Sequence, residues 1–173
     1  MTKKIMFSDD YCLTKAVLDG TKTMTRRLLK DGTPLGNWEE TVKRLPYKVG
    51  EVVAIAQSYY TIGKTQYDKF GNGVPGNSNK MFTRAELMPH HIRITDIKVE
   101  RLQSISDEDI LKEGVCQYPK LRAYHVSKAT GFAPDVAFLT AREAFAYLID
   151  RISGRGTWKS NPWVVAYEFK LID

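Results

Sequence analysis

The chain has 173 residues, of which 43% are hydrophobic and 27% charged, as in an ordinary globular protein rather than a disordered or fibrous one. It carries 26 basic and 20 acidic residues, and this net charge of +6 permits a nucleic acid or another anionic ligand without requiring either. No run of about 18 apolar residues occurs, so no membrane span is expected. Residues 1–173 therefore predict a single domain. The absence of a secretory signal at the start and the presence of only 2 cysteines favour a cytoplasmic location.

The first third of the chain predicts a strand, a helix and a second strand. Residues 3–7 form a short apolar strand, and Ser8 then offers an N-cap for a helix that runs to Asp19. Gly20 can take the left-handed conformation that ends a helix. The Thr-rich residues 22–29 predict the next strand.

The middle of the chain contains a long insertion between two strands. Residues 52–56 are apolar and β-branched, which is typical of a buried strand. The polar, glycine-rich segment 61–81 is either a functional flap or a disordered excursion, and the sequence leaves both open. Residues 91–102 alternate, but the alternation changes phase at Thr95 and Asp96, which predicts a β-bulge. Bulged, bent strands are common where a sheet curls into a barrel.

Two capped helices and a strand complete the expected elements. Ser106 and the acids after it begin a short helix, and a capping box at Thr140 begins a longer amphipathic one. A second insertion, 116–138, reads as irregular, and 163–171 predict the last strand. The sequence therefore predicts an α+β fold, with a small, partly closed β-barrel and about three flanking helices.

The segment Gly-Thr-Lys-Thr-Met-Thr-Arg-Arg, residues 20–27, concentrates charge and hydroxyl groups. Side chains of a strand alternate, which places Thr23, Thr25 and Arg27 on one face and Lys22, Met24 and Arg26 on the other. At the turn before the strand, Lys22 could still bend toward Thr25. A hydroxyl beside an amine and a guanidinium can bind an anion, or act as a nucleophile with an adjacent base. The alternative is a solvated basic edge strand.

Few other residues carry a chemical signal. The three histidines lack metal-ligand spacing and no nucleotide-cofactor motif occurs, so we expect neither a metal nor a cofactor. Trp158 lies in a glycine-rich loop and could stack on a nucleobase, whereas Trp163 is expected in the core. Glu113 ends the short helix, where the helix dipole disfavours a negative charge, so it is either solvated or paired with a cation.

Taken together, these motifs resemble the ASCH family, a branch of the PUA-like fold. The resemblance rests on pieces spread over most of the chain: Gly20-x-Lys22-Thr23-x-Thr25-x-Arg27, Tyr47-x-Val49-Gly50-Glu51-x-Val53, the strand 92–102, the helix from Ile105-Ser106 to Glu113-Gly114, and Asn161-Pro162-Trp163-Val164.

The resemblance implies a PUA-like β-barrel with a basic cleft that binds RNA or nucleotide-like ligands. One bacterial subfamily hydrolyses N4-acetylcytidine, and its catalytic residues fall, by motif, on Lys22, Thr25 and Glu113, with its arginine on Arg27. This chain departs from that subfamily in its greater length and in Arg26, which stands where an apolar residue is usual.

Three functional hypotheses follow, and a protein–protein adaptor also stays open. The first is an RNA- or nucleotide-binding domain, with ligand contacts from Thr23, Arg26, Arg27 and Trp158. The second is an amidohydrolase acting on an acylated nucleoside through Lys22, Thr25 and Glu113, and the third is a ribonuclease. The second fails if the charged groups of Lys22 and Glu113 lie more than about 8 Å apart without a cleft between them. The sequence does not determine the oligomeric state.

Overall fold

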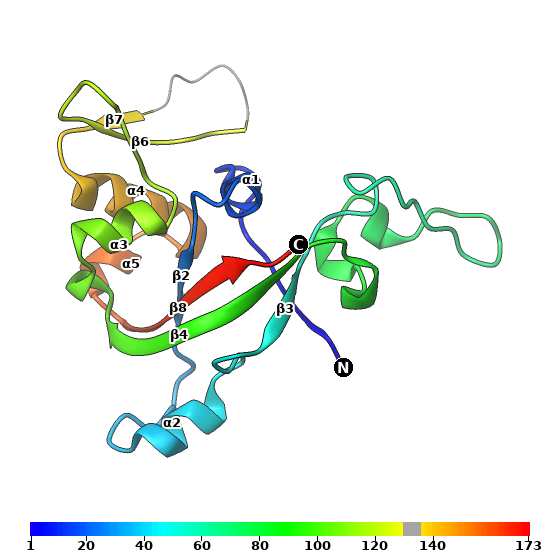
Figure 1. Ribbon diagram of the computed structural model, residues 1–173, viewed down its shortest axis with the longest axis horizontal. Coiled ribbons are helices and arrows are strands. Elements are labelled where there is room, and N and C mark those ends of the chain that lie inside the picture. Colours follow the sequence, from blue (N-terminus) through cyan, green and yellow to red (C-terminus); the bar gives the residue numbers. More distant parts are fainter. Residues whose placement is uncertain (130–135) are drawn as a thin grey trace.

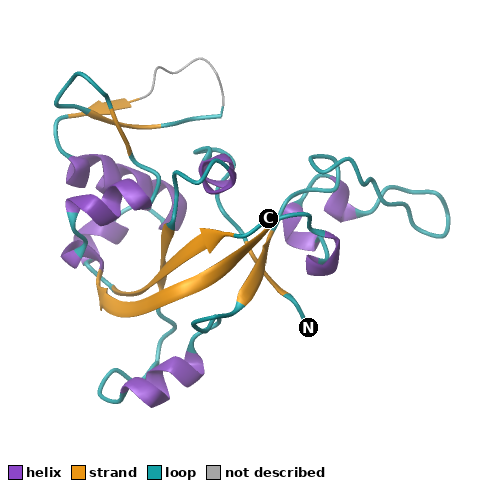
Figure 2. Ribbon diagram, viewed as in Figure 1, coloured by secondary structure: helices purple, strands orange, loops and turns teal. Residues whose placement is uncertain are grey.

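The structure is a computed structural model that describes residues 1–129 and 136–173, and it confirms the α+β class (Figures 1 and 2). Its main sheet contains, in spatial order, β1 (Lys3–Ile5), β3 (Val52–Ile55), β4 (His91–Arg101), β8 (Trp163–Leu171) and β2 (Met24–Leu28). The β1–β3 pair is parallel, and the other pairs are antiparallel. Among the described residues β1 and β2 each pair with a single neighbour, so the sheet is compatible with a partly closed barrel and not with a closed one.

Strand β4 contains the predicted bulge. Its register against β8 shifts between Ile94 and Asp96, and its buried positions change phase there, from Ile92 and Ile94 to Ile97. The strand bends along its length, as Figure 2 shows. The bend lets one strand pair with β3 at its start and with β8 throughout, which curls the sheet around the core.

The described residues contain five α-helices, two more than the sequence predicted. They are α1 (Leu13–Leu18), α2 (Trp38–Arg44), α3 (Asp107–Lys112), α4 (Ala141–Ser153) and α5 (Thr157–Ser160). The predicted caps of α3 and α4 are confirmed: the Ser106 and Thr140 side chains accept bonds from the Asp109 and Glu143 amides. The predicted start of α1 at Ser8 is wrong. Its N-cap is Cys12, because residues 9–12 form a turn and Asp9 accepts a bond from the Thr14 hydroxyl instead.

The first insertion, 61–81, is built from turns and short 3-10 helices rather than from strands. Helix η1 (Pro75–Asn77) lies within it and η2 (Lys80–Phe82) crosses its end. Helix η3 (Ala85–Leu87) comes after it, before β4, and η4 (Leu102–Ser104) follows β4. Tyr59, just before this segment, is buried, and its neighbour Tyr60 is exposed.

The expectation that 116–138 is irregular is wrong. This segment forms a small antiparallel sheet of β5 (Cys116–Gln117), β6 (Tyr124–Val126) and β7 (Val136–Phe138). Strands of two or three residues are too short to show an alternating pattern, so no periodicity predicts them. Residues 130–135 lie outside the described residues, and with them Ala133-Pro134, a dipeptide that is expected to break any long element.

The core lies between the main sheet and α4, with α1 and α3 at its margin. Its fully buried side chains include Ile5, Val17, Ile55, Ile92, Ile110, Phe145, Leu148 and Tyr167. The prediction that Trp163 is a core residue is wrong, because the residue is 37% exposed and the Arg101 guanidinium lies over its ring, 4.6 Å from the ring centroid. In the described residues, no helix has the length and apolar character needed to cross a membrane.

Candidate functional site

The turn between α1 and β2 carries Lys22 into the protein. Gly20 has a φ of 78°, and after it the amides of Thr21 and Lys22 both donate to the Ala16 carbonyl. A residue with a Cβ is strained at this φ, which explains the glycine. The chain then enters β2 at Met24, and the Lys22 side chain turns inward, with 2% of the residue exposed.

The Lys22 ammonium group has its three hydrogens matched by three acceptors. Its Nζ lies 2.7 Å from the Met24 carbonyl oxygen, 2.7 Å from the Glu113 carbonyl oxygen and 3.2 Å from Glu113 Oε2. Burial lowers the pKa of Lys22 below its usual value, and the Glu113 carboxylate opposes that shift. Lys22 is therefore a cation with all three hydrogens bonded, and its burial favours the neutral amine.

Glu113 holds two cations at once. Its Oε2 accepts from Lys22, and its Oε1 accepts from Arg26 at 2.9 Å. The residue is the C-cap of α3 and is 5% exposed. The negative charge that the dipole of α3 disfavours is thus compensated by paired cations, and the Lys22–Glu113 contact is far shorter than the 8 Å limit that the catalytic hypothesis set.

Arg26 is the centre of a buried ionic network, and it alternates along β2 with Thr25 and Arg27, which face the other side of the sheet. The register across β2, β8 and β4 places Arg26 and Lys98 on either side of Ala166. The Arg26 guanidinium donates to Glu100 at 2.6 Å, to Asp109 at 3.2 Å and to Glu113, and its side chain is 0% exposed. Three carboxylates thus occupy its terminal nitrogens, and they compensate the buried charge of Arg26.

Arg27 lies on the other face of β2, over the ring of Phe7. Its guanidinium carbon is 5.7 Å from the ring centroid, and one terminal nitrogen donates to the Met6 carbonyl oxygen. Its Nε is buried and has no hydrogen-bond partner among the described residues. Burial lowers the pKa of Arg27, whereas Tyr47, Glu113 and Tyr167 act in the opposite direction. Arg27 is therefore a cation whose burial is incompletely compensated.

A cavity of about 460 Å³ opens in front of these residues. Its polar wall comes from the turn and β2, and its apolar wall from α4. The residues that line it include Phe7, Tyr11, Leu13, Lys22, Thr25, Arg26, Arg27, Lys80, Glu113, Phe145, Leu148, Ile149 and Arg151. Its volume lies in the range of small-molecule sites.

Thr25 lines this cavity and is 5% exposed. It pairs with Tyr167 across β2 and β8, which places it on the same face as Arg27. Within the part of the chain that the structure describes, its hydroxyl makes no hydrogen bond, so it is available to a ligand. The cavity thus brings together Lys22, Thr25 and Glu113, although no hydrogen bond joins Lys22 to Thr25 in the described residues.

Thr23 and Trp158 do not line the cavity. Thr23 contributes backbone bonds, since its amide donates to the Lys112 carbonyl and its carbonyl accepts from the Phe169 amide. The Trp158 ring packs edge-on against Phe145, a residue of the cavity wall, with centroids 5.9 Å apart. Trp158 therefore supports the wall from behind.

The sequence missed the cavity residues outside the 20–27 motif and Glu113. Phe7, Lys80 and Arg151 come from β1's end, the first insertion and α4, and only the fold brings them together. The one signal in the sequence was that Lys80 and Arg151 are basic, and many surface residues of the chain are basic as well. No group of three or more His, Cys, Asp or Glu side chains in the described residues is placed to hold a metal ion.

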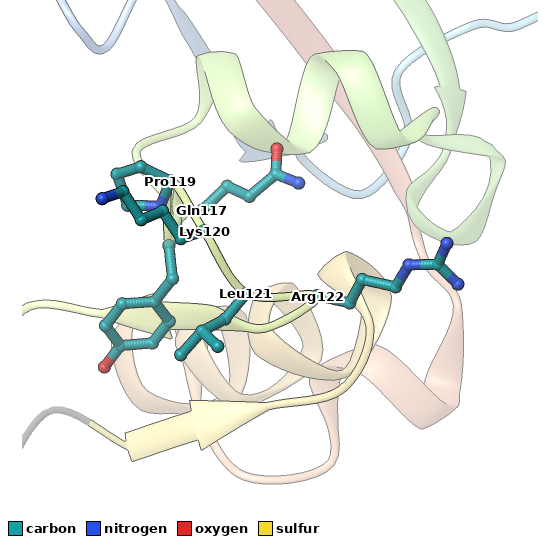
Figure 3. Close-up of a pocket in the computed structure, with 6 residues that line it drawn as sticks. Gln117, Pro119, Lys120, Leu121 and Arg122 are labelled. Atoms are coloured by element: carbon teal, nitrogen blue, oxygen red, sulfur yellow. The ribbon is translucent and has the colours of Figure 1, made fainter.

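A second hollow, of about 380 Å³, lies at the β5–β6 turn (Figure 3). It is lined by six consecutive residues, 117–122. The labelled side chains of Gln117 and Arg122 lie apart in Figure 3 and do not point toward one another. A ligand site needs polar groups that converge, so this hollow is a weaker candidate than the Lys22 cavity.

Two bacterial crystal structures are among the solved structures that are similar to this chain. No protein-family model matches the chain, and no curated protein matches it. A protein from Enterococcus faecalis described as DUF984 aligns with 100% of this chain and 82% of its own, at 14% identity and a TM-score of 0.48. An ASCH domain from Lactobacillus crispatus aligns with 98% of this chain and 78% of its own, at 14% identity and a TM-score of 0.42. At this level of similarity, a ligand or an activity has to be inferred from the residues of the cavity itself.

Proposed function

We propose that the Lys22 cavity binds a single ligand of nucleoside or nucleotide size. The observation that carries this proposal is the pair of unsatisfied groups in one cavity, the buried Nε of Arg27 and the free hydroxyl of Thr25. Leaving a buried polar group unpaired costs about 1–3 kcal/mol, and such groups in a native protein call for an explanation. A bound ligand that accepts from Arg27 and bonds to Thr25 provides it.

The rest of the cavity fits a flat, partly polar ligand. Phe145, Leu148 and Ile149 offer an apolar surface, and Phe7 carries a ring against which Arg27 already packs. Arg151 adds a further cation, and its guanidinium carbon lies 4.9 Å from the ring centroid of Tyr147. A nucleobase suits the apolar wall, and a phosphate or carbonyl oxygen suits the guanidinium. The Nε of Arg26 is also buried without a partner among the described residues, but three carboxylates already occupy its terminal nitrogens, so ligand contact is assigned to Arg27.

Calorimetric titration with cytidine and with cytidine 5′-monophosphate tests this proposal. We expect the monophosphate to bind more tightly, and Arg27→Gln to weaken its binding about ten- to a hundredfold, because a charged hydrogen bond is lost. Arg93→Gln is the matched control, since Arg93 is an exposed arginine outside the cavity that donates to the Gly50 carbonyl. Failure of the wild-type protein to bind either compound would overturn the proposal.

A second candidate is the hydrolysis of an acyl amide held in this cavity, with N4-acetylcytidine as the test substrate. Two observations favour it: Thr25 has a free hydroxyl, and the same cavity holds a lysine whose pKa burial lowers. A threonine hydroxyl needs a base before it can attack, and a neutral lysine can serve. The Lys22–Glu113 contact keeps the amine at the cavity wall.

The reaction balances with the residues present. Neutral Lys22 takes the proton of the Thr25 hydroxyl, and Oγ1 bonds to the acyl carbonyl carbon, whose oxygen becomes an anion facing Arg27. The carbon–nitrogen bond then breaks, and the Lys22 ammonium returns the proton to the departing amine, which leaves cytidine. Water hydrolyses the Thr25 ester and releases acetate. For the first step Lys22 has to give up one of its three hydrogen bonds, so the arrangement observed is that of the resting, protonated form.

Release of cytidine from N4-acetylcytidine, followed by chromatography, tests this second candidate. We expect turnover that requires Thr25, and a protein that binds the acetylated nucleoside but leaves it intact would contradict hydrolysis while leaving the binding proposal in place.

A further inference from the structure

The segment between β3 and β4, residues 58–88, forms an arm that projects from the body of the molecule, shown in teal to green in Figure 1. Side chains fix its shape from within. The Asn77 side chain accepts from the Gln66 amide at 2.9 Å and donates to the Gln66 carbonyl at 2.8 Å. Asp68 accepts from the amides of Phe70 and Asn72, and the Tyr59 hydroxyl accepts from the Arg84 amide. The arm is thus a structured element without regular strands.

This arm exposes large apolar side chains that its own folding does not use. Their exposed fractions are 64% for Tyr60, 66% for Tyr67, 76% for Phe70, 57% for Met81 and 59% for Phe82. Single exposed apolar residues are normal, but several on one short, internally braced segment indicate a binding surface. Rings held outward on a fixed support can accept a flat partner at little cost in ordering.

Charged residues between the rings indicate the kind of partner. Lys64 and Lys69 are exposed and form no ion pair in the described residues, and the Lys69 ammonium lies 5.0 Å from the Phe70 ring centroid. The acid next to them, Asp68, is occupied by the turn amides. Protein interfaces are depleted in lysine, whereas surfaces for single-stranded nucleic acid combine stacking rings with cations.

Lys80 connects the arm to the cavity. It belongs to η2, and its ammonium group reaches back to bond Asp9 at 2.9 Å, the Thr14 hydroxyl at 3.2 Å and the Phe7 carbonyl. Lys80 lines the cavity that holds Lys22 and Arg27. A nucleic-acid strand with one nucleotide bound in the cavity would therefore emerge from the cavity beside the base of the arm.

We propose that the arm binds the nucleotides that flank the one held in the cavity, so that the ligand of this protein is a single-stranded nucleic acid. This inference rests on the proposed nucleotide-binding function. It adds a second surface, with stacking contacts from Tyr67 and Phe70 and phosphate contacts from Lys64 and Lys69.

Fluorescence anisotropy with labelled oligocytidylate of about ten nucleotides, a length within the usual range for such sites, tests the inference against cytidine 5′-monophosphate. We expect the oligonucleotide to bind at least about tenfold more tightly than the mononucleotide. Tyr67→Ala/Phe70→Ala should weaken oligonucleotide binding at least about tenfold and leave mononucleotide binding unchanged, because stacking is lost only on the arm. Trp38→Ala is the control, an exposed ring on α2, outside the arm.

Salt dependence and the DNA analogue complete the test. Lys64→Gln/Lys69→Gln should reduce the slope of log affinity against log salt by about one per lysine. Tighter binding of oligocytidylate than of its deoxy analogue identifies RNA as the ligand. Equal binding indicates that the arm accepts single-stranded RNA and DNA alike. Mononucleotide binding with no gain for the oligonucleotide, or an arm variant that binds the oligonucleotide normally, overturns the arm inference alone. If the wild-type protein does not bind the mononucleotide, the proposed function is overturned instead.

Discussion

Arg26→Ala should lower the free energy of unfolding by about 3–5 kcal/mol, because it leaves buried carboxylates without their cation. The Arg26 side chain is 0% exposed and bonds Glu100, Asp109 and Glu113, whose side chains are 21%, 12% and 6% exposed. These three negative charges cannot all regain water without opening the sheet edge at β2. Urea unfolding followed by tryptophan fluorescence measures the change.

Lys98→Ala is the matched control for Arg26→Ala. Lys98 bonds the same Asp109 at 2.8 Å, but its side chain is 44% exposed. An ion pair that water reaches contributes less than about 1 kcal/mol, so this variant should unfold close to the wild type. Equal losses in the two variants would show that Arg26 is no more important than a surface cation. If Arg26→Ala does not fold, Arg26→Lys, which keeps the charge but fewer donors, should give a smaller and measurable loss.

Acid unfolding gives a second readout of the same network. Burial alone would raise the pKa of Asp109, but hydrogen bonds and charge from Lys98 and Arg26 hold it below its usual value. A carboxyl whose pKa is lower in the folded state stabilises the protein above its unfolded pKa of about 3.9, and this contribution disappears as the pH falls through the folded pKa. Without Arg26 the folded pKa rises, so unfolding in acid should begin at a higher pH than in the wild type.

The elements that the sequence predicted well are those with local signals. Ser106 and Thr140 are N-caps, because their side-chain oxygens lie a fixed three residues from the amides that they accept. The bulge at Asp96 followed from a change of phase within a single strand. In each case the residues that determine the structure are neighbours in the chain, and elementary geometry is enough.

The elements that it missed depend on contacts between distant segments. Helix α2 has only one buried residue, Thr41, so no apolar periodicity marks it. The small β5–β6–β7 sheet is recognisable only through its pairing. Trp163 looked like a core residue, but Arg101 covers its exposed ring. Likewise, the composition of the 20–27 motif indicated where the candidate site lies. That Glu113 forms ion pairs with both Lys22 and Arg26 is visible only in the folded chain.

Thr25→Ala should reduce the release of cytidine from N4-acetylcytidine at least about a thousandfold, if the cavity hydrolyses this amide, because the variant has no nucleophile. Binding of the substrate should persist, since the cavity walls are unchanged. Thr25→Ser keeps a hydroxyl at the same position and should retain turnover. Thr21→Ala is the control, as Thr21 is exposed and its hydroxyl bonds the Ala16 carbonyl outside the cavity. Full activity in Thr25→Ala would assign the attack to another group.

The pH profile of this turnover distinguishes a base from a structural cation at Lys22. A lysine acts as a base only when neutral, so the rate should rise with pH and level off above its pKa, which burial lowers from the usual value. The Glu113 carboxylate raises that pKa, so in Glu113→Gln the rise should move to lower pH. If Glu113 itself transfers the proton, the same variant should lose its turnover at every pH. If Lys22 only holds Glu113 in place, the profile should not respond to the lysine at all, and Lys22→Arg, which keeps the charge but cannot become neutral, should remain active.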